Sequence, residues 1–239
     1  KVRQRHPAPK AEAVNRLRGE PGTKVTVWTE RDGWREPRRH VLTRDVIQVQ
    51  SVKQRMLEKN YGYVRLSQFQ VHTGSDLLKS LEKLQKENNG ELKGLVLDMR
   101  NNPGGVLQAA VDVADAFIND GLVVYTKGRL TDSDMQFSAT PGDQLKGVPI
   151  VVLINGGSES ASEIVAGALQ DHHRAVIMGT TSFGKGSVQT VLPLHNNRAL
   201  KLTTARYYTP GGRSIQAEGI VPDIQVDNAR LTTVEENDR

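Results

Sequence analysis

Three serines lie close together in a glycine-rich segment, residues 155–162, at Ser158, Ser160 and Ser162. An apolar strand pattern over residues 149–154 precedes this segment, and a helical pattern over residues 160–171 follows it. Loops of this kind present backbone N–H groups and side chains at the carboxyl end of a sheet, where α/β proteins place their sites. Each serine is therefore either a helix cap or a nucleophile, and residue type alone leaves both interpretations open.

A second glycine-rich loop, residues 179–187, carries Lys185 between Gly184 and Gly186. It nearly matches the phosphate-binding P-loop, but Gly186 occupies the position of the metal-binding hydroxyl. The β-branched side chains that follow predict a strand, whereas a P-loop must open a helix. ATP binding is therefore the weaker hypothesis, and nucleotide-dependent stabilisation with Mg-ATP would test it.

Lys185 is a candidate general base. Burial lowers a lysine pKa from about 10.4 by up to 3–5 units, which would leave a neutral amine able to accept a serine proton. The alternative is an ordinary exposed loop lysine. None of the six histidines lies in a glycine-rich setting beside an acid. A Ser-His-Asp site therefore remains the minority interpretation.

Metal and thiol chemistry find little support. His172 and His173 follow a helix expected to end at Asp171, where a cation complements the helix dipole, so a metal pair is not indicated. The chain has no cysteine, which excludes a thiolate metal site and a cysteine nucleophile. We expect no metal and no cofactor.

Alternating strand and helix patterns must position the two loops. One helix is expected to be capped by Ser75 and to bury Leu77, Leu78, Leu81 and Leu84 on one face. A second carries its apolar residues at helical spacing from Leu107 to Phe117. The expected strands cover residues 61–69, 92–99, 122–126, 149–154, 174–178, 188–194 and 199–208. Strand, crossover helix and strand in succession predict an α/β fold with a mixed, mostly parallel βαβ sheet.

The first 50 residues have a different pattern. Residues 11–18 predict a helix, and residues 24–30 and 40–50 predict strands, which together form a small α+β segment. Residues 1–10 are basic, and residues 227–239 are polar and expected to fray.

Composition limits the classes of partner. The chain has 239 residues, a net charge of +5 and only 5% aromatic residues. A nucleic-acid binder would need stacking platforms that this composition does not supply, so we expect no nucleic acid. No apolar run reaches the roughly 18–20 residues that cross a bilayer.

Four segments carry a resemblance to a known family. Together they resemble the carboxyl-terminal processing peptidases, or tail-specific proteases, which are Ser/Lys-dyad serine proteases with a PDZ domain. The resemblance extends over roughly residues 51–225. The segments are Gly62-Tyr63-Val64-Arg65, Leu97-Asp98-Met99-Arg100-Asn101-Asn102-Pro103-Gly104-Gly105, Ser158-Glu159-Ser160-Ala161-Ser162-Glu163-Ile164 and Phe183-Gly184-Lys185-Gly186-Ser187-Val188-Gln189.

The resemblance implies a protease core over residues 51–239 and the second half of a PDZ domain over residues 11–50. Residues 1–10 would form a separate basic segment ahead of a gap. It assigns the nucleophile to Ser160, the general base to Lys185 and the orientation of that lysine to Gln189. The expected oxyanion-hole donors are the N–H of Ala161 and one N–H from Gly104 or Gly105.

One position departs from the family pattern. Glu159 stands where the family has alanine, directly before the expected nucleophile. A carboxylate there would hold a neighbouring lysine in its charged form and reduce activity. Ser158 and Ser162 are expected to bond the backbone or cap the helix rather than to attack substrate.

The resemblance implies a serine endopeptidase that cleaves proteins near unstructured C-terminal tails through an acyl-enzyme on Ser160. It also implies homo-oligomers, an adaptor protein as a further partner, and a location outside the cytoplasm, in a bacterial periplasm or associated with its membrane. The alternative function is a protease-like scaffold that binds peptides without turnover. Glu159 and the incomplete PDZ portion motivate that alternative.

Overall fold

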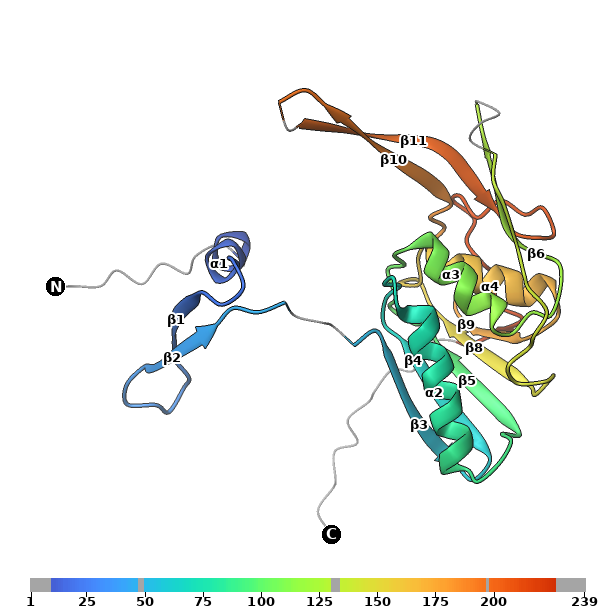
Figure 1. Cartoon of the computed structure of the whole chain (residues 1–239), viewed down its shortest axis with the longest axis horizontal. Coiled ribbons are helices and arrows are strands. Elements are labelled where there is room, and N and C mark those ends of the chain that lie inside the picture. The colour runs from blue at the N-terminus through green and yellow to red at the C-terminus, as the bar shows by residue number, and fades with distance from the viewer. Residues whose placement is uncertain (1–9, 47–49, 130–133, 197, 227–239) are drawn as a thin grey trace, which may run out of the picture. The chain divides into compact units, whose positions relative to one another are not determined.

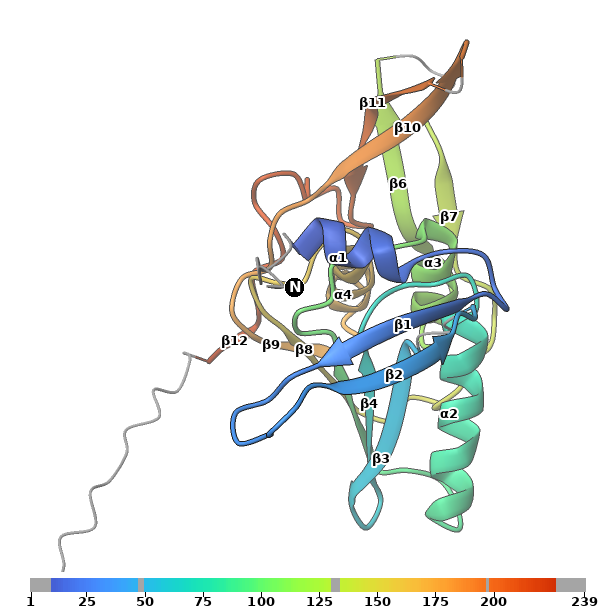
Figure 2. The same cartoon turned by 90° about the vertical axis from the view of Figure 1, so that its left-hand side faces the viewer.

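The computed structural model describes residues 10–46, 50–129, 134–196 and 198–226. The chain divides into two units, Lys1–Val49 and Gln50–Arg239 (Figures 1 and 2). The division lies within two residues of the boundary expected before the core; the PDZ assignment of the first unit remains a prediction. The basic segment was expected at residues 1–10; Lys10 begins helix α1, and residues 1–9 and the tail at 227–239 lie outside the described residues.

The helices are α1 Lys10–Leu17, α2 Thr73–Glu87, α3 Leu107–Asp115 and α4 Ala161–Asp171. The strands are β1 Lys24–Thr29, β2 Arg38–Thr43, β3 Val52–Glu58, β4 Tyr61–Leu66, β5 Gly94–Asp98, β6 Leu122–Gly128, β7 Gln136–Ser138, β8 Ile150–Ile154, β9 Val176–Gly179, β10 Ser187–Leu194, β11 Arg198–Tyr208 and β12 Ile224–Gln225. In the described part of the chain, no helix combines the length and the apolar character that crossing a membrane requires.

The main sheet of the second unit has the strand order β12-β9-β8-β5-β4-β3. Every neighbouring pair from β12 to β4 is parallel, and only β3 runs antiparallel, at the edge. The predicted α/β fold with a mostly parallel sheet is therefore confirmed. Strands β5, β8 and β9 are nearly continuous apolar runs, as expected for central parallel strands.

A second, antiparallel sheet has the order β10-β11-β6-β7. The predicted strands over residues 188–194 and 199–208 form its β10–β11 hairpin, but the sequence did not predict that β6 joins them. Most side chains in the outer part of this hairpin are exposed, and both views show it extending away from the helices (Figures 1 and 2).

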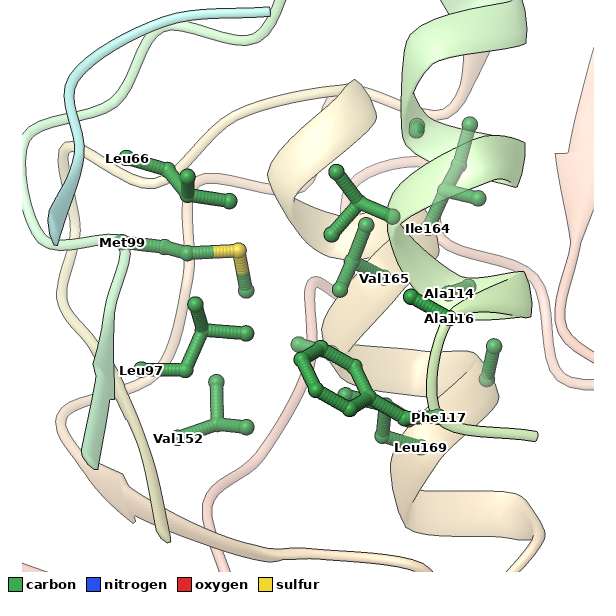
Figure 3. Packing of buried hydrophobic residues seen from close by; sticks show 14 of the residues in the cluster. Leu66, Leu97, Met99, Ala114, Ala116, Phe117, Val152, Ile164, Val165 and Leu169 are labelled. Carbon is green, nitrogen blue, oxygen red and sulfur yellow. The ribbon is translucent and has the colours of Figure 1, made fainter. Parts of the chain in front are cut away.

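The core lies between the main sheet and helices α3 and α4. In Figure 3, Leu97, Met99 and Val152 of the sheet side point toward Ile164 and Phe117 of the helical side. All five side chains are almost completely buried. This packing fixes the ends of β5 and β8 relative to the start of α4.

Two details of helix α2 differ from the expectation. Leu78 is 38% exposed, because it lies beside the stripe that Leu77, Leu81 and Leu84 bury. Ser75 is not the cap: the helix begins at Thr73, and the Ser75 hydroxyl donates to the carbonyl of His72.

The first unit consists of α1 and the antiparallel β1–β2 hairpin. We predicted a strand over residues 40–50, but strand β2 ends at Thr43. The reason is Arg44, whose guanidinium donates to the carbonyls of Leu17 and Arg16 at the end of α1. Residues 47–49 of the predicted strand lie outside the described residues.

Candidate active site

Three loops emerge from the same edge of the main sheet. Strands β5, β8 and β9 are parallel neighbours, so the loops that follow their carboxyl ends meet at one edge. These loops carry Gly104 and Gly105 after β5, Ser160 after β8 and Lys185 after β9. The topology therefore gathers residues that lie far apart in the sequence.

The two serines beside Ser160 serve the backbone. Ser158 and Ser162 are fully buried; the Ser158 hydroxyl donates to the carbonyl of Met99, and the Ser162 hydroxyl donates to that of Asn102. This confirms that neither is free to act as a nucleophile.

Ser160 has a different environment and a strained backbone. It is partly exposed and lies at the N-cap of α4, with φ 52° and ψ −108°. Such a conformation costs a non-glycine residue on the order of 1–3 kcal/mol, and it is typical of sharp turns that present a nucleophile between a strand and a helix.

The glycine pair after β5 lies directly against this turn. A Cβ added to Gly104 would stand 2.9 Å from the Cβ of Ser160 and 3.0 Å from the nitrogen of Ala161. Gly105 is equally restricted, since its Cβ would stand 2.0 Å from the carbonyl oxygen of Phe69. Both have positive φ, so only glycine allows this approach.

The buried Asn102 holds the glycine turn in place. Its side-chain amide donates to the carbonyl of Leu66, its Oδ1 accepts the N–H of Gly104, and its carbonyl accepts the N–H of Glu159. The N–H of Gly104 is therefore already bonded. Among the described residues, the N–H groups of Ala161 and Gly105 donate to no protein acceptor, which makes this pair the better oxyanion donors.

Glu163 joins the serine loop to the lysine loop. Its carboxylate is fully buried and accepts four hydrogen bonds, all 2.6–2.8 Å long. One comes from the N–H of Ser160, and three come from the lysine loop. The three lysine-loop donors are the Ser182 hydroxyl and the N–H groups of Gly184 and Lys185.

The side chain of Lys185 is less buried than expected. We expected a desolvated amine, but this side chain is 44% exposed, and its Nζ lies 3.5 Å from the carboxylate of Glu159. In the described part of the chain, no hydrogen bond joins Ser160 Oγ to Lys185 Nζ. Ser160 and Lys185 thus lie in the same site, and the Lys185 amine faces the carboxylate of Glu159.

Within the described residues, Gln189 makes no hydrogen bond to Lys185. Its side chain is exposed and makes no hydrogen bond within the described ranges, and the register of β10 against β11 shifts between Val188 and Gln189. The roles of Ser160, Lys185, Gln189 and the oxyanion donors remain predictions.

The geometry of the described residues does not favour the P-loop, histidine or metal interpretations. The lysine loop leads into strand β10 rather than a helix, which contradicts a P-loop. His172 lies at the end of α4 and bonds the carbonyl of Leu122 through Nε2. Within residues that the structure describes, no group of three metal-binding side chains comes together.

Comparison with known proteins agrees with this arrangement. The sequence profile of peptidase family S41 matches residues 60–226, which include all three loops. The chain belongs to this family.

Several S41 relatives are close in sequence. The carboxy-terminal-processing protease of Bartonella bacilliformis is 54% identical over 217 residues, which cover 90% of this chain and 50% of that protein. The carboxyl-terminal-processing protease of Synechocystis sp. is 36% identical and is matched over 94% of this chain and 52% of that protein. This S41 chain therefore spans about half the length of these relatives.

A solved S41-type structure shares the fold. The photosystem II D1 C-terminal processing protease superposes with a TM-score of 0.67 at 34% identity, covering 87% of this chain and 57% of that one. The resemblance to the carboxyl-terminal processing peptidases is thereby confirmed at the level of family and fold.

Two residues of this S41 site were missed by the sequence analysis, namely Glu163 and Asn102. Glu163 follows Ser160 at the spacing of a capping box, in which the acid at N3 reaches back to the N-cap N–H. That spacing was a usable signal. No local sequence pattern indicated the structural role of Asn102, because its hydrogen-bond partners come from β4 and from the serine loop.

Asp98 anchors the start of the glycine loop. Its buried carboxylate accepts hydrogen bonds from the Tyr63 hydroxyl, from Arg65 and from the backbone and guanidinium of Arg100. Burial acts to raise the pKa of Asp98, but the hydrogen bonds from Arg100 and Tyr63 outweigh it and lower the pKa from 3.8 to about 2.

This shift predicts a loss of stability in acid. The contribution of Asp98 is fully present above its unfolded pKa, and it is lost as the pH falls through the folded pKa near 2. Between pH 5 and pH 2 the free energy of unfolding is expected to fall by about 2 kcal/mol more in the wild type than in Asp98→Asn. Urea unfolding measured across this range tests it, with the exposed Glu87→Gln as control; parallel pH profiles for wild type and Asp98→Asn would contradict it.

Proposed function

We propose that the protein is a serine endopeptidase of the carboxyl-terminal processing type. The observation that carries the proposal is Ser160, held in a strained turn at the N-terminus of α4 beside two N–H groups that have no acceptor among the described residues. Strained nucleophile turns and converging N–H donors are the parts that acyl transfer needs. The names of the S41 relatives support a peptidase rather than the inert scaffold.

In the proposed reaction, neutral Lys185 takes the hydroxyl proton of Ser160 as Oγ attacks the scissile carbonyl carbon. The N–H groups of Ala161 and Gly105 receive the oxygen that becomes negative. Lys185 then gives the proton to the leaving amine, and an acyl ester remains on Ser160. Water, deprotonated by Lys185, hydrolyses the ester and restores the hydroxyl.

Strand β10 offers a place for an extended substrate. It is an edge strand of the second sheet, and it begins two residues after Lys185. An unstructured tail that added to this edge as a further strand would run past the site, with backbone hydrogen bonds giving affinity for varied sequences. We therefore propose C-terminal tails of proteins as substrates. An extracytoplasmic location, an adaptor protein and homo-oligomers belong to the same proposal, and they rest on the family resemblance.

A covalent serine probe tests this function directly. A fluorophosphonate reacts with activated serines, so we expect one adduct, on the peptide that contains Ser160, and loss of labelling in excess unfolded casein. The same preparation is expected to hydrolyse casein. An adduct on another serine, or intact casein with no adduct across pH 7–10, would reject the proposal.

A further inference from the structure

The contact between Glu159 and Lys185 involves two residues with fixed backbones. The N–H of Glu159 donates to the carbonyl of Asn102, and its own carbonyl accepts the N–H of Ser162. The N–H of Lys185 is bound by the carboxylate of Glu163. Both main chains are anchored next to each other, and the Glu159 carboxylate lies 3.5 Å from Lys185 Nζ.

The other charged groups around Lys185 are placed differently. Glu163 of α4 is committed to four hydrogen bonds, and it receives the backbone of Lys185 rather than the amine. Glu218 belongs to the segment that packs on Gly184, and its side chain is exposed. Arg206 pairs with Ser187 across the hairpin and is also exposed. Within the described residues, only the carboxylate of Glu159 lies within ion-pair distance of Nζ.

The position of Glu159 gives this contact a chemical consequence. Glu159 directly precedes Ser160, so the carboxylate that lies 3.5 Å from the proposed base belongs to the same loop as the expected nucleophile. A carboxylate favours the ammonium form, whereas attack by Ser160 requires the neutral amine. The two partners therefore demand opposite protonation states of Lys185.

We propose that Glu159 is a positioning residue that competes with Ser160 for Lys185 and shifts the activity of the peptidase to higher pH. The inference rests on the proposed role of Lys185 as the base. Exposed ion pairs are typically worth 0.2–1 kcal/mol, which corresponds to a displacement of about half a pH unit. Glu159 thus limits proteolysis near neutral pH without blocking it.

The first test is the pH dependence of kcat/KM for a fluorogenic peptide. In Glu159→Gln, the acid limb is expected to move down by about half a pH unit and the activity at pH 7 to rise about threefold. Wild type and variant are expected to converge at high pH, where the ammonium form is no longer populated in either. High salt is expected to move the wild type toward the variant and to leave Glu159→Gln unchanged.

Glu91→Gln is the matched control, because it breaks the exposed ion pair between Glu91 and Lys146 with the same change of charge. Its acid limb is expected to match the wild type. Coincident acid limbs for wild type and Glu159→Gln, or an equal shift in Glu91→Gln, overturn the proposal. Should Glu159→Gln unfold, Glu159→Ala supplies the same comparison.

A second measurement needs no catalysis. Trace acetylation with acetic anhydride labels only the neutral amine, so mass spectrometry reports how the reactivity of Lys185 rises with pH. In Ser160→Ala protein, adding Glu159→Gln is expected to move this rise about half a unit lower. An unchanged rise overturns the inference. A shifted rise, together with a wild-type protein that does not cleave casein, would reject the proposed peptidase while leaving the Glu159 contact established.

Discussion

Replacement of Ser160 by alanine is expected to lower kcat/KM for casein at least a hundredfold, and Lys185→Ala is expected to do the same. Ser160 supplies the attacking oxygen and Lys185 removes its proton, so neither residue acts without the other. Groups that act as a unit lose activity non-additively, so the double variant is expected to be no worse than either single one. Gln189→Ala is expected to lose less, because its side chain is exposed and makes no hydrogen bond to the amine among the described residues.

The controls are a serine and a lysine outside the site. Ser75 is an exposed serine of α2, and Lys146 is an exposed lysine paired with Glu91. Ser75→Ala and Lys146→Ala are expected to retain wild-type kcat/KM. Casein cleavage at similar rates by wild type, Ser160→Ala and Lys185→Ala would eliminate the dyad.

Replacement of Glu163 is expected to damage both stability and activity. In Glu163→Ala, four donors in a buried site lose one shared acceptor. A buried donor left without its acceptor typically costs about 1–3 kcal/mol. Because the carboxylate spans the serine and lysine loops, their separation is expected to change, and misplacement by about 1 Å can lower kcat a hundredfold. Urea unfolding and the rate of fluorophosphonate labelling measure the two effects.

Ser182→Ala separates the shared role of Glu163 from the loss of one of its donors. It removes the hydroxyl that donates to Glu163 and accepts the N–H of Ile220, and it leaves the bonds of Glu163 to Ser160, Gly184 and Lys185 intact. We expect a loss of about 1–3 kcal/mol and labelling within a few-fold of the wild type. A Glu163→Ala protein that remains folded and labels as fast as Ser182→Ala would show that Glu163 does not set the geometry of the site.

Much of the fold could be predicted because its signals are local. The apolar runs of β5 and β8, and the glycine-rich loops after them, predict buried parallel strands that end in a site. Strand β3 was missed because its residues alternate in exposure and include several charges, as befits an edge strand. The pairing of β6 with β11 was missed because it depends on contacts between distant segments.

Some features of the candidate site could likewise be predicted from the sequence, and others could not. Loop composition indicated three serines and Lys185 as candidates, and the family resemblance selected Ser160 among the serines. The position of Glu159 before Ser160 suggested that its carboxylate could act on the lysine, but not the 3.5 Å approach to Nζ. The sequence also could not indicate that the N–H of Gly104 is bonded to Asn102 Oδ1, because this depends on a side-chain direction that a linear pattern does not contain. Glu163 is intermediate: its spacing from Ser160 was visible, but its bonds to the lysine loop were not.

The site is assembled from the ends of three neighbouring strands, and this has a consequence for the newly made chain. Residues that meet at the sheet edge are widely separated along the polypeptide, so long-range strand pairing must be complete before they come together. A half-folded copy has unstructured segments of the kind that the proposed enzyme would cut, but it has no assembled site. If the proposed activity is correct, a newly made chain would therefore acquire its site only late in folding, and a half-folded copy would be unable to cut itself.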